Sequence, residues 1–206
     1  MATVPNYKVY NLENAIRVSK FPMAVNTEEL NCEAVKRTYS LAGTERGEGH
    51  DNFLHGILVA YDVSFSNKIW LEMERYHFAE IISSQSTMHR ISSFELDGAY
   101  IKYVDKRMID IMNELKDNYN RTKEMEDYLK LLYSNPCGFI LTAGMTTNYG
   151  QLKTIYNQRW NHRLPEWHRF CAWIESLPMF VELILKGVRK FTDENGLPLK
   201  EEYDWR

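Results

Sequence analysis

TTNYGQLKTIYNQRWNHRLPEW, residues 146–167, decides how the rest of this chain is organised. It reads as a short amphipathic helix, a turn and the start of a second helix. Leu152, Ile155 and Tyr156 recur at the i, i+3, i+4 spacing of one buried helix face. The next position of that face is Arg159. Because a buried guanidinium keeps its proton, it requires an anion, a carbonyl or a cleft beside it.

Polar residues mark where both helices begin. Asn148, followed three residues later by Gln151, is typical of a helix N-terminus with a capping box. Pro165 is expected at the first position of the second helix. Because Gln, Asn, Arg and His are dense around these two ends, the stretch is a candidate binding site with Arg159 as its cation. The alternative is a core helix in which Arg159 pairs with a buried carboxylate.

The composition is that of one globular domain. Of the 206 residues, 44% are apolar and 13% aromatic, which is enough for a hydrophobic core. The formal net charge of −3 argues against bulk nucleic-acid binding. The three cysteines show no metal-ligand spacing, and no apolar run has membrane-spanning length. We therefore expect a cytoplasmic protein with no metal and no membrane partner, with one domain over 1–191 and a polar, loosely held tail over 192–206.

Strands are expected near the front of the chain and helices behind them. Residues 7–11 and 53–65 are rich in aliphatic and aromatic residues, as strands are. Apolar stripes at helical spacing predict further helices at 66–80, 105–118, 122–133 and 178–191. This order favours an α+β fold.

A hydroxyl-rich segment, SSQSTMHR, occupies residues 83–90. Its four hydroxyls, one amide and terminal cations suit the binding of a phosphate or a nucleobase. The alternative is a hydroxyl-rich edge strand. If the segment is extended, Met88 and Arg90 point to the same side, because side chains alternate with period two.

Short motifs along the chain occur in the order of a known family. Phe53-Leu54-His55 precedes the best strand, and Pro136, Asn148 and Arg159 follow at fixed spacing. On these motifs, residues 33–185 resemble the flavin-dependent thymidylate synthases, in a divergent form of the kind found in phages. Gly150 stands where the family's Asn-Ala-Arg motif has its arginine, and His162 is one residue short of a family histidine.

The family's middle motif, R-H-R-x-x-S-x-N-E-x-S-x-R, fits the chain in two registers. The first preserves the length of the segment after His55 and is preferred. It places His77 on the middle histidine and Ser86 on the last serine. Both flanking arginines are then lost, although Arg75 lies one place away, and Met88 replaces the final arginine.

The second register uses the end of the hydroxyl-rich segment. It places Met88-His89-Arg90 on R-H-R, with Gln85 matching a glutamine three residues ahead of that motif. The residues by themselves leave both registers open.

The resemblance implies a central, mostly antiparallel sheet with flanking helices and the reductive methylation of dUMP to dTMP. Methylenetetrahydrofolate would give the carbon, FAD would carry the hydride and NADPH would reload the flavin. Family members are homotetramers with active sites shared between subunits. The implied catalytic residue is Arg159, which would stabilise charge on the pyrimidine. Implied substrate-binding residues are Gln85, Ser86, Thr87, Arg90, Gln151 and Arg159, and implied flavin-binding residues are His55, Arg75, His77, Asn148 and His162.

The missing arginines leave two alternatives open. One is a catalytically silent or re-purposed relative that binds a pyrimidine nucleotide. The other is a flavoenzyme that modifies a different pyrimidine nucleotide. In each case a bacterial host or a phage-infected cell is the expected location.

Overall fold

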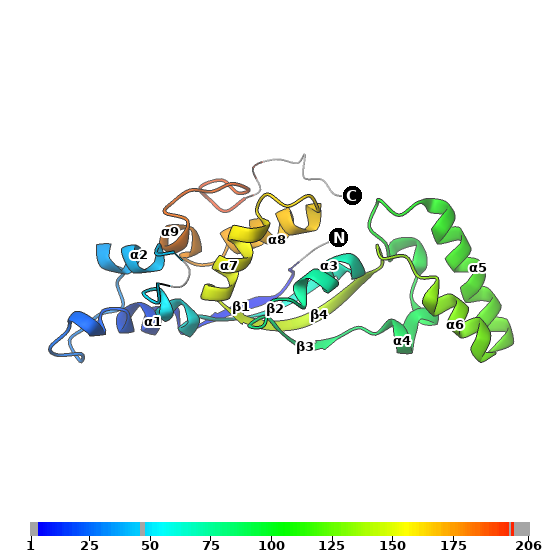
Figure 1. Cartoon of the computed structure of the whole chain (residues 1–206), viewed down its shortest axis with the longest axis horizontal. Helices are drawn as coiled ribbons and strands as arrows, with labels where there is room; N and C mark the ends of the chain where they lie inside the picture. Colours follow the sequence, from blue (N-terminus) through cyan, green and yellow to red (C-terminus); the bar gives the residue numbers. More distant parts are fainter. Residues whose placement is uncertain (1–3, 46–47, 198, 200–206) are drawn as a thin grey trace.

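The computed structural model describes residues 4–45, 48–197 and 199. Its centre is a four-stranded antiparallel sheet in the order β1-β2-β4-β3. The strands are β1 (Tyr7–Tyr10), β2 (Leu58–Ser66), β3 (Glu80–Ser84) and β4 (Ile140–Asn148). Helices α3 (Asn67–Met73), α7 (Tyr149–Arg159) and α8 (Pro165–Glu175) gather over one face of this sheet (Figure 1). The expected α+β class with an antiparallel sheet is confirmed.

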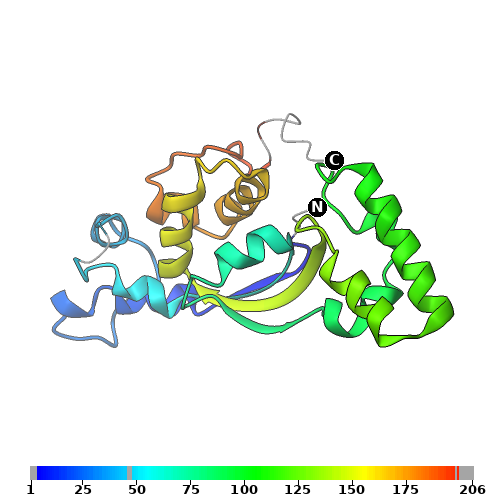
Figure 2. The same ribbon diagram turned by 45° about the vertical axis from the view of Figure 1, so that its right-hand side comes forward.

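The two central strands give the sheet one covered and one open face. β2 and β4 pair along their full lengths, from Leu58 opposite Asn148 to Ser66 opposite Ile140. Val63 and Met145 point under the helices and are 0% exposed, whereas their sequence neighbours point to the other side. Among the described residues, no helix lies against that other face in either view (Figures 1 and 2).

α7 and α8 begin where the sequence predicts. The Asn148 side chain accepts the Gln151 backbone N–H at 2.9 Å, which caps α7. Pro165 is the first residue of α8. Leu152 and Ile155 are 0% exposed, so the predicted stripe of α7 is its core face.

A helical hairpin forms a second core at one end of the sheet. α5 (Lys106–Thr122) and α6 (Met125–Tyr133) pack on each other, and the predicted helices in this region are confirmed with small shifts of their ends. Tyr128 of α6 donates a hydrogen bond to the Met88 carbonyl of α4 (Thr87–Arg90). The remaining helices are α1 (Leu12–Val18), α2 (Lys36–Ala42) and α9 (Phe180–Ile184), with short 3₁₀ turns at η1 (Phe21–Met23), η2 (Asn52–Gly56), η3 (Ile91–Ser93) and η4 (Leu96–Gly98).

Three predicted elements are shorter than the sequence indicates. The strand expected from residue 53 begins at Leu58, because residues 52–56 form η2. The helix expected over 66–80 ends at Met73, because Glu80 is already paired with β4. The helix expected over 178–191 reduces to α9, because Lys186 and Gly187 adopt positive φ angles that end helices.

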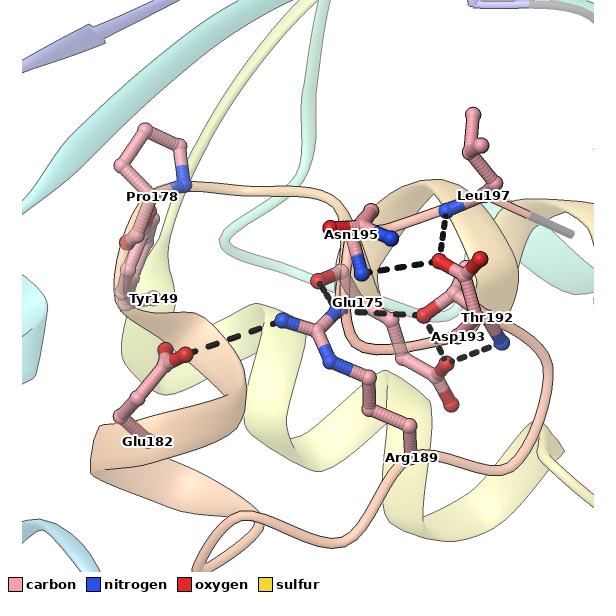
Figure 3. Close-up of polar contacts among 9 residues, drawn as sticks. All are labelled: Tyr149, Glu175, Pro178, Glu182, Arg189, Thr192, Asp193, Asn195 and Leu197. Atoms are coloured by element: carbon pink, nitrogen blue, oxygen red, sulfur yellow. Dashed lines mark hydrogen bonds and ion pairs between the residues drawn. The ribbon is translucent and has the colours of Figure 1, made fainter.

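The segment that follows α9 is anchored on a buried carboxylate. Glu175 is 1% exposed, and its oxygens accept N–H bonds from Lys190, Phe191 and Thr192 at 2.9–3.2 Å. Figure 3 shows Thr192 and Arg189 gathered beside Glu175. Thr192 is 2% exposed, so the expectation of a loosely held tail is wrong at its first residue. Residues 198 and 200–206 of the expected tail lie outside the described residues, and the domain boundary after 191 stays a prediction.

None of the helices in the described part of the chain is both long and apolar enough to span a membrane. Within the same residues, no three His, Cys, Asp or Glu side chains are grouped as a metal site requires.

Candidate functional site

α7 carries candidate residues at both ends. Asn148 caps its first turn, and Arg159 is its last residue. At a rise of about 1.5 Å per residue, these two positions are roughly 16 Å apart along the helix axis. The predicted flavin-side and substrate-side residues of this helix therefore form two separate groups.

The first group includes His55, which α7 holds in place. Lys153 of α7 donates to the Asp51 carboxylate at 2.7 Å, just before η2. The Tyr149 N–H donates to the Ile57 carbonyl at 3.0 Å, just after η2. The 3₁₀ turn that contains His55 is thus attached to α7 at both of its ends.

His55 lies directly on Gly150. A Cβ atom at position 150 would be 2.7 Å from His55 Cε1, which is closer than real side chains approach. The glycine at position 150 therefore makes room for the imidazole. The structure brings His55 and Asn148 to the same end of α7.

A shallow groove of about 360 Å³ opens next to Asn148 on the uncovered face of the sheet. Large apolar side chains along it are half-exposed, with Tyr10 at 49%, Leu58 at 52% and Phe78 at 63%. The Thr147 hydroxyl holds the connection between α3 and β3 by donating to the Phe78 carbonyl at 2.8 Å. The groove is lined by Tyr10, Leu58, Val59, Ala60, Phe78, Glu80, Thr146, Thr147 and Asn148.

Arg75 and His77 lie on the same α3–β3 connection, and both are exposed. Gln151, in contrast, is only 6% exposed in the first turn of α7. Its binding role stays a prediction, as do those of Arg75 and His77.

The second group surrounds Arg159. Its Nη1 donates to Glu72 Oε2 at 3.0 Å, and its Nε donates to the Tyr76 hydroxyl at 2.7 Å. The guanidinium carbon lies 4.7 Å from the centre of the Trp167 ring and 5.6 Å from that of Tyr76. The carboxylate partner that the sequence left open as an alternative is therefore present. The catalytic role of Arg159 stays a prediction.

His162 completes this group. Its Nε2 is 3.5 Å from Glu72 Oε2, and its Nδ1 accepts the Leu164 backbone N–H at 3.2 Å. Since Nδ1 is an acceptor, the neutral ring carries its proton on Nε2, facing Glu72. Desolvation lowers the pKa of His162 and outweighs the opposing effect of the Glu72 carboxylate. Arg159 and His162, predicted to serve substrate and flavin, are thus joined through one carboxylate.

Sequence reasoning missed Glu72, although a signal for it exists. Glu72 follows the buried Ile69 by three residues and precedes the buried Tyr76 by four, which is helical spacing in both directions. An acid at such a position is available to a cation that is also predicted to point inward.

The hydroxyl-rich segment is an edge strand followed by a helical turn. Ser83 and Ser84 belong to the exposed strand β3, as the alternative interpretation expected. Gln85 Oε1 accepts the Thr142 N–H at 2.9 Å, which places it about 20 Å along β4 from Asn148. The binding roles predicted for Gln85, Ser86 and Thr87 stay predictions.

The expectation that Met88 and Arg90 point to the same side of an extended segment is wrong. Both are in α4, where residues two apart point roughly 200° away from each other. Arg90 is exposed, and its guanidinium makes no hydrogen bond within the described part of the chain. Arg90 is thus an exposed cation on α4, and its role in phosphate binding stays a prediction.

No family model and no curated protein sequence matches this chain. Solved structures do match its fold. A flavin-dependent thymidylate synthase, ThyX, from Helicobacter pylori, complexed with FAD and dUMP, aligns with TM-score 0.67 and 13% identity over 89% of this chain and 99% of that one. A UMP/dUMP methylase, PolB, from Streptomyces cacaoi, bound with 5-Br dUMP, aligns with TM-score 0.62 and 10% identity over 90% and 91%. The chain therefore has the fold of these enzymes.

Proposed function

We propose that this protein catalyses the flavin-dependent reductive methylation of dUMP to dTMP, with methylenetetrahydrofolate and NADPH as co-substrates. The observation that carries the proposal is the placement of Asn148 and Arg159. They lie at the two ends of one helix, in a fold shared with enzymes that were crystallised with FAD and dUMP. A cytoplasmic location is part of the same proposal.

The groove beside Asn148 suits the ring system of a flavin. Its half-exposed Tyr10, Leu58 and Phe78 offer apolar surface, while Asn148 and the neighbouring His55 offer polar groups at one end. FAD would supply the hydride chemistry, and these residues would orient its ring and shield it from water. Arg75 and His77, exposed on the adjoining connection, are the proposed contacts for the rest of the cofactor.

Arg159 would act on the pyrimidine. A fixed cation with little exposure to water stabilises negative charge on a carbonyl oxygen more strongly than a solvated one. The phosphate would be held by Gln85, Ser86, Thr87 and Arg90, with Gln151 near the base.

A shared site explains why these groups lie apart in one chain. Asn148, Arg159 and Gln85 are separated by roughly 16–20 Å along α7 and β4. In an oligomer, a second copy of the chain would supply the residues that one chain holds too far from its own groove. We therefore include a homotetramer with shared active sites in the proposal.

A second candidate is a flavoenzyme that modifies another pyrimidine nucleotide, or a silent relative that only binds one. It is favoured by the arginines that the resemblance leads one to expect and that this chain lacks, including those at Gly150 and Met88. It is also favoured by the likeness to a methylase that acts on UMP and dUMP. Incubation with dUMP, UMP and dCMP in separate reactions, followed by product analysis, discriminates the substrates.

Flavin binding tests the proposal. We expect the purified protein to be yellow, or to quench the fluorescence of added FAD with saturation. Asn148→Ser should weaken FAD binding about three- to tenfold, the value of one hydrogen bond, with little change in stability because serine also caps helices. A colourless protein that does not quench FAD fluorescence would contradict the proposed chemistry.

A further inference from the structure

Glu72 is the carboxylate on which three donors converge. Its Oε2 accepts hydrogen bonds from Arg159 Nη1 and Trp167 Nε1, each at 3.0 Å, and lies 3.5 Å from His162 Nε2. The Glu72 and Arg159 side chains are each only 14% exposed. Because both side chains are largely shielded from water, solvent screens the ion pair only weakly. Each charge therefore strongly changes the electrostatic potential at the other.

Two hydrogen bonds and two aromatic rings fix the guanidinium of Arg159. Nη1 is bound to Glu72 and Nε to Tyr76, whose hydroxyl donates in turn to Gln158 Oε1 at 3.0 Å. The Trp167 and Tyr76 rings lie beside the cation. Nη2 alone makes no hydrogen bond within the described part of the chain. Both N–H groups of Nη2 therefore remain for a ligand, and their direction is set by the contacts of Nη1 and Nε.

Charge decides which kind of acceptor Nη2 suits. Arg159 and Glu72 together are close to neutral, and His162 adds no charge while its ring is neutral. A neutral pair still donates a well-directed hydrogen bond, but it attracts a dianion much less than a lone guanidinium does. Nη2 is therefore matched to a carbonyl oxygen rather than to a phosphate.

We propose that Glu72 is a positioning residue that cancels the charge of Arg159 and aims Nη2 at a carbonyl oxygen of the bound pyrimidine, while the phosphate is held elsewhere. This inference rests on the proposed function, because it assumes that a pyrimidine nucleotide binds beside Arg159. It adds a residue from α3 to the site and excludes Arg159 from phosphate recognition.

Binding of dUMP and deoxyuridine by isothermal titration tests the inference. Glu72→Gln keeps a carbonyl oxygen for Arg159 and Trp167 but removes the negative charge. We expect the ratio of dUMP to deoxyuridine affinity to rise about three- to tenfold, because the uncompensated guanidinium then attracts the phosphate. Arg159→Gln should weaken both ligands by a similar factor and leave the ratio unchanged.

Glu74→Gln is the matched control. Glu74 lies just after α3 and is exposed, and its side chain makes no hydrogen bond or ion pair within the described residues. It changes the net charge by the same amount but not the environment of Arg159, so the affinity ratio should stay within about twofold of wild type.

The outcomes separate this inference from the proposed function. If wild type binds neither ligand, both are overturned. If wild type binds dUMP but Glu72→Gln shifts the ratio no more than Glu74→Gln, the role of Glu72 alone is wrong. If Glu72→Gln does not fold, the Arg159→Gln variant still tests the inference. A loss of dUMP affinity without a loss of deoxyuridine affinity would show that Arg159 binds the phosphate, and the inference would be wrong.

Discussion

Arg159→Gln should lower kcat for thymidylate formation by about 10²–10³, the usual effect of removing one donor that stabilises a developing anion. Its Nη2 makes no hydrogen bond to the described residues, while Glu72 and Tyr76 hold the guanidinium in place. Glutamine has a shorter side chain and no charge, so it can neither reach nor stabilise the same oxygen. Steady-state kinetics with saturating cofactors measure the effect.

The same substitution should also reduce stability, in contrast to what the sequence pattern indicates. If Arg159 serves substrate only, stability should change by no more than about 1 kcal/mol. In the structure, its removal leaves Glu72 with Trp167 as its remaining close donor. Since the carboxylate is 14% exposed, we expect a loss of about 1–3 kcal/mol, below the cost of stranding a fully buried charge.

Arg159→Lys separates the two effects. Lysine keeps a positive charge for Glu72 but lacks the planar fork that contacts Tyr76 and Glu72 together. It should recover much of the stability and little of the activity. An Arg159→Gln enzyme with near-normal kcat would remove Arg159 from the reaction and leave it a structural ion pair.

Glu175→Ala should cost about 3–5 kcal/mol of unfolding free energy, the largest stability effect that we expect in this protein. The carboxylate is 1% exposed and accepts the N–H groups of Lys190, Phe191 and Thr192. It also accepts the Tyr156 hydroxyl at 2.5 Å and the Thr192 hydroxyl at 2.8 Å. Alanine leaves these donors without their acceptor and releases the segment that follows α9; Figure 3 shows Thr192 beside Glu175.

Thermal and urea unfolding measure this loss, which corresponds to a fall in Tm of roughly 6–20 °C for a chain of this size. Glu182→Ala is the control, because it removes the same charge at a half-exposed carboxylate that lies 3.7 Å from Arg189. Such an ion pair contributes at most about 1 kcal/mol. If the two variants lose equal stability, the anchoring role of Glu175 is wrong.

Local sequence signals determined the elements that carry the site. Each of these signals involves residues within one or two helical turns of each other. They are the apolar stripe of Leu152 and Ile155, the Asn148 cap and Pro165. Periodicity and capping act over such short distances, so α7 and the start of α8 follow from the sequence. The α+β class follows in the same way, from the order of strand and helix patterns.

Tertiary structure decided which partners those elements meet. Arg159 could be recognised as an inward-pointing cation, but its acceptor Glu72 is 87 residues away and comes from another helix. The fit of His55 on Gly150 and the anchoring of Thr192 by Glu175 likewise join segments that only the packed sheet and helices bring together. The helix expected to reach Glu80 ends at Met73 for the same reason, because pairing of Glu80 with β4 outweighs local propensity. The local pattern shows that an inward-pointing charge needs an oppositely charged partner. Long-range packing determines which residue that partner is.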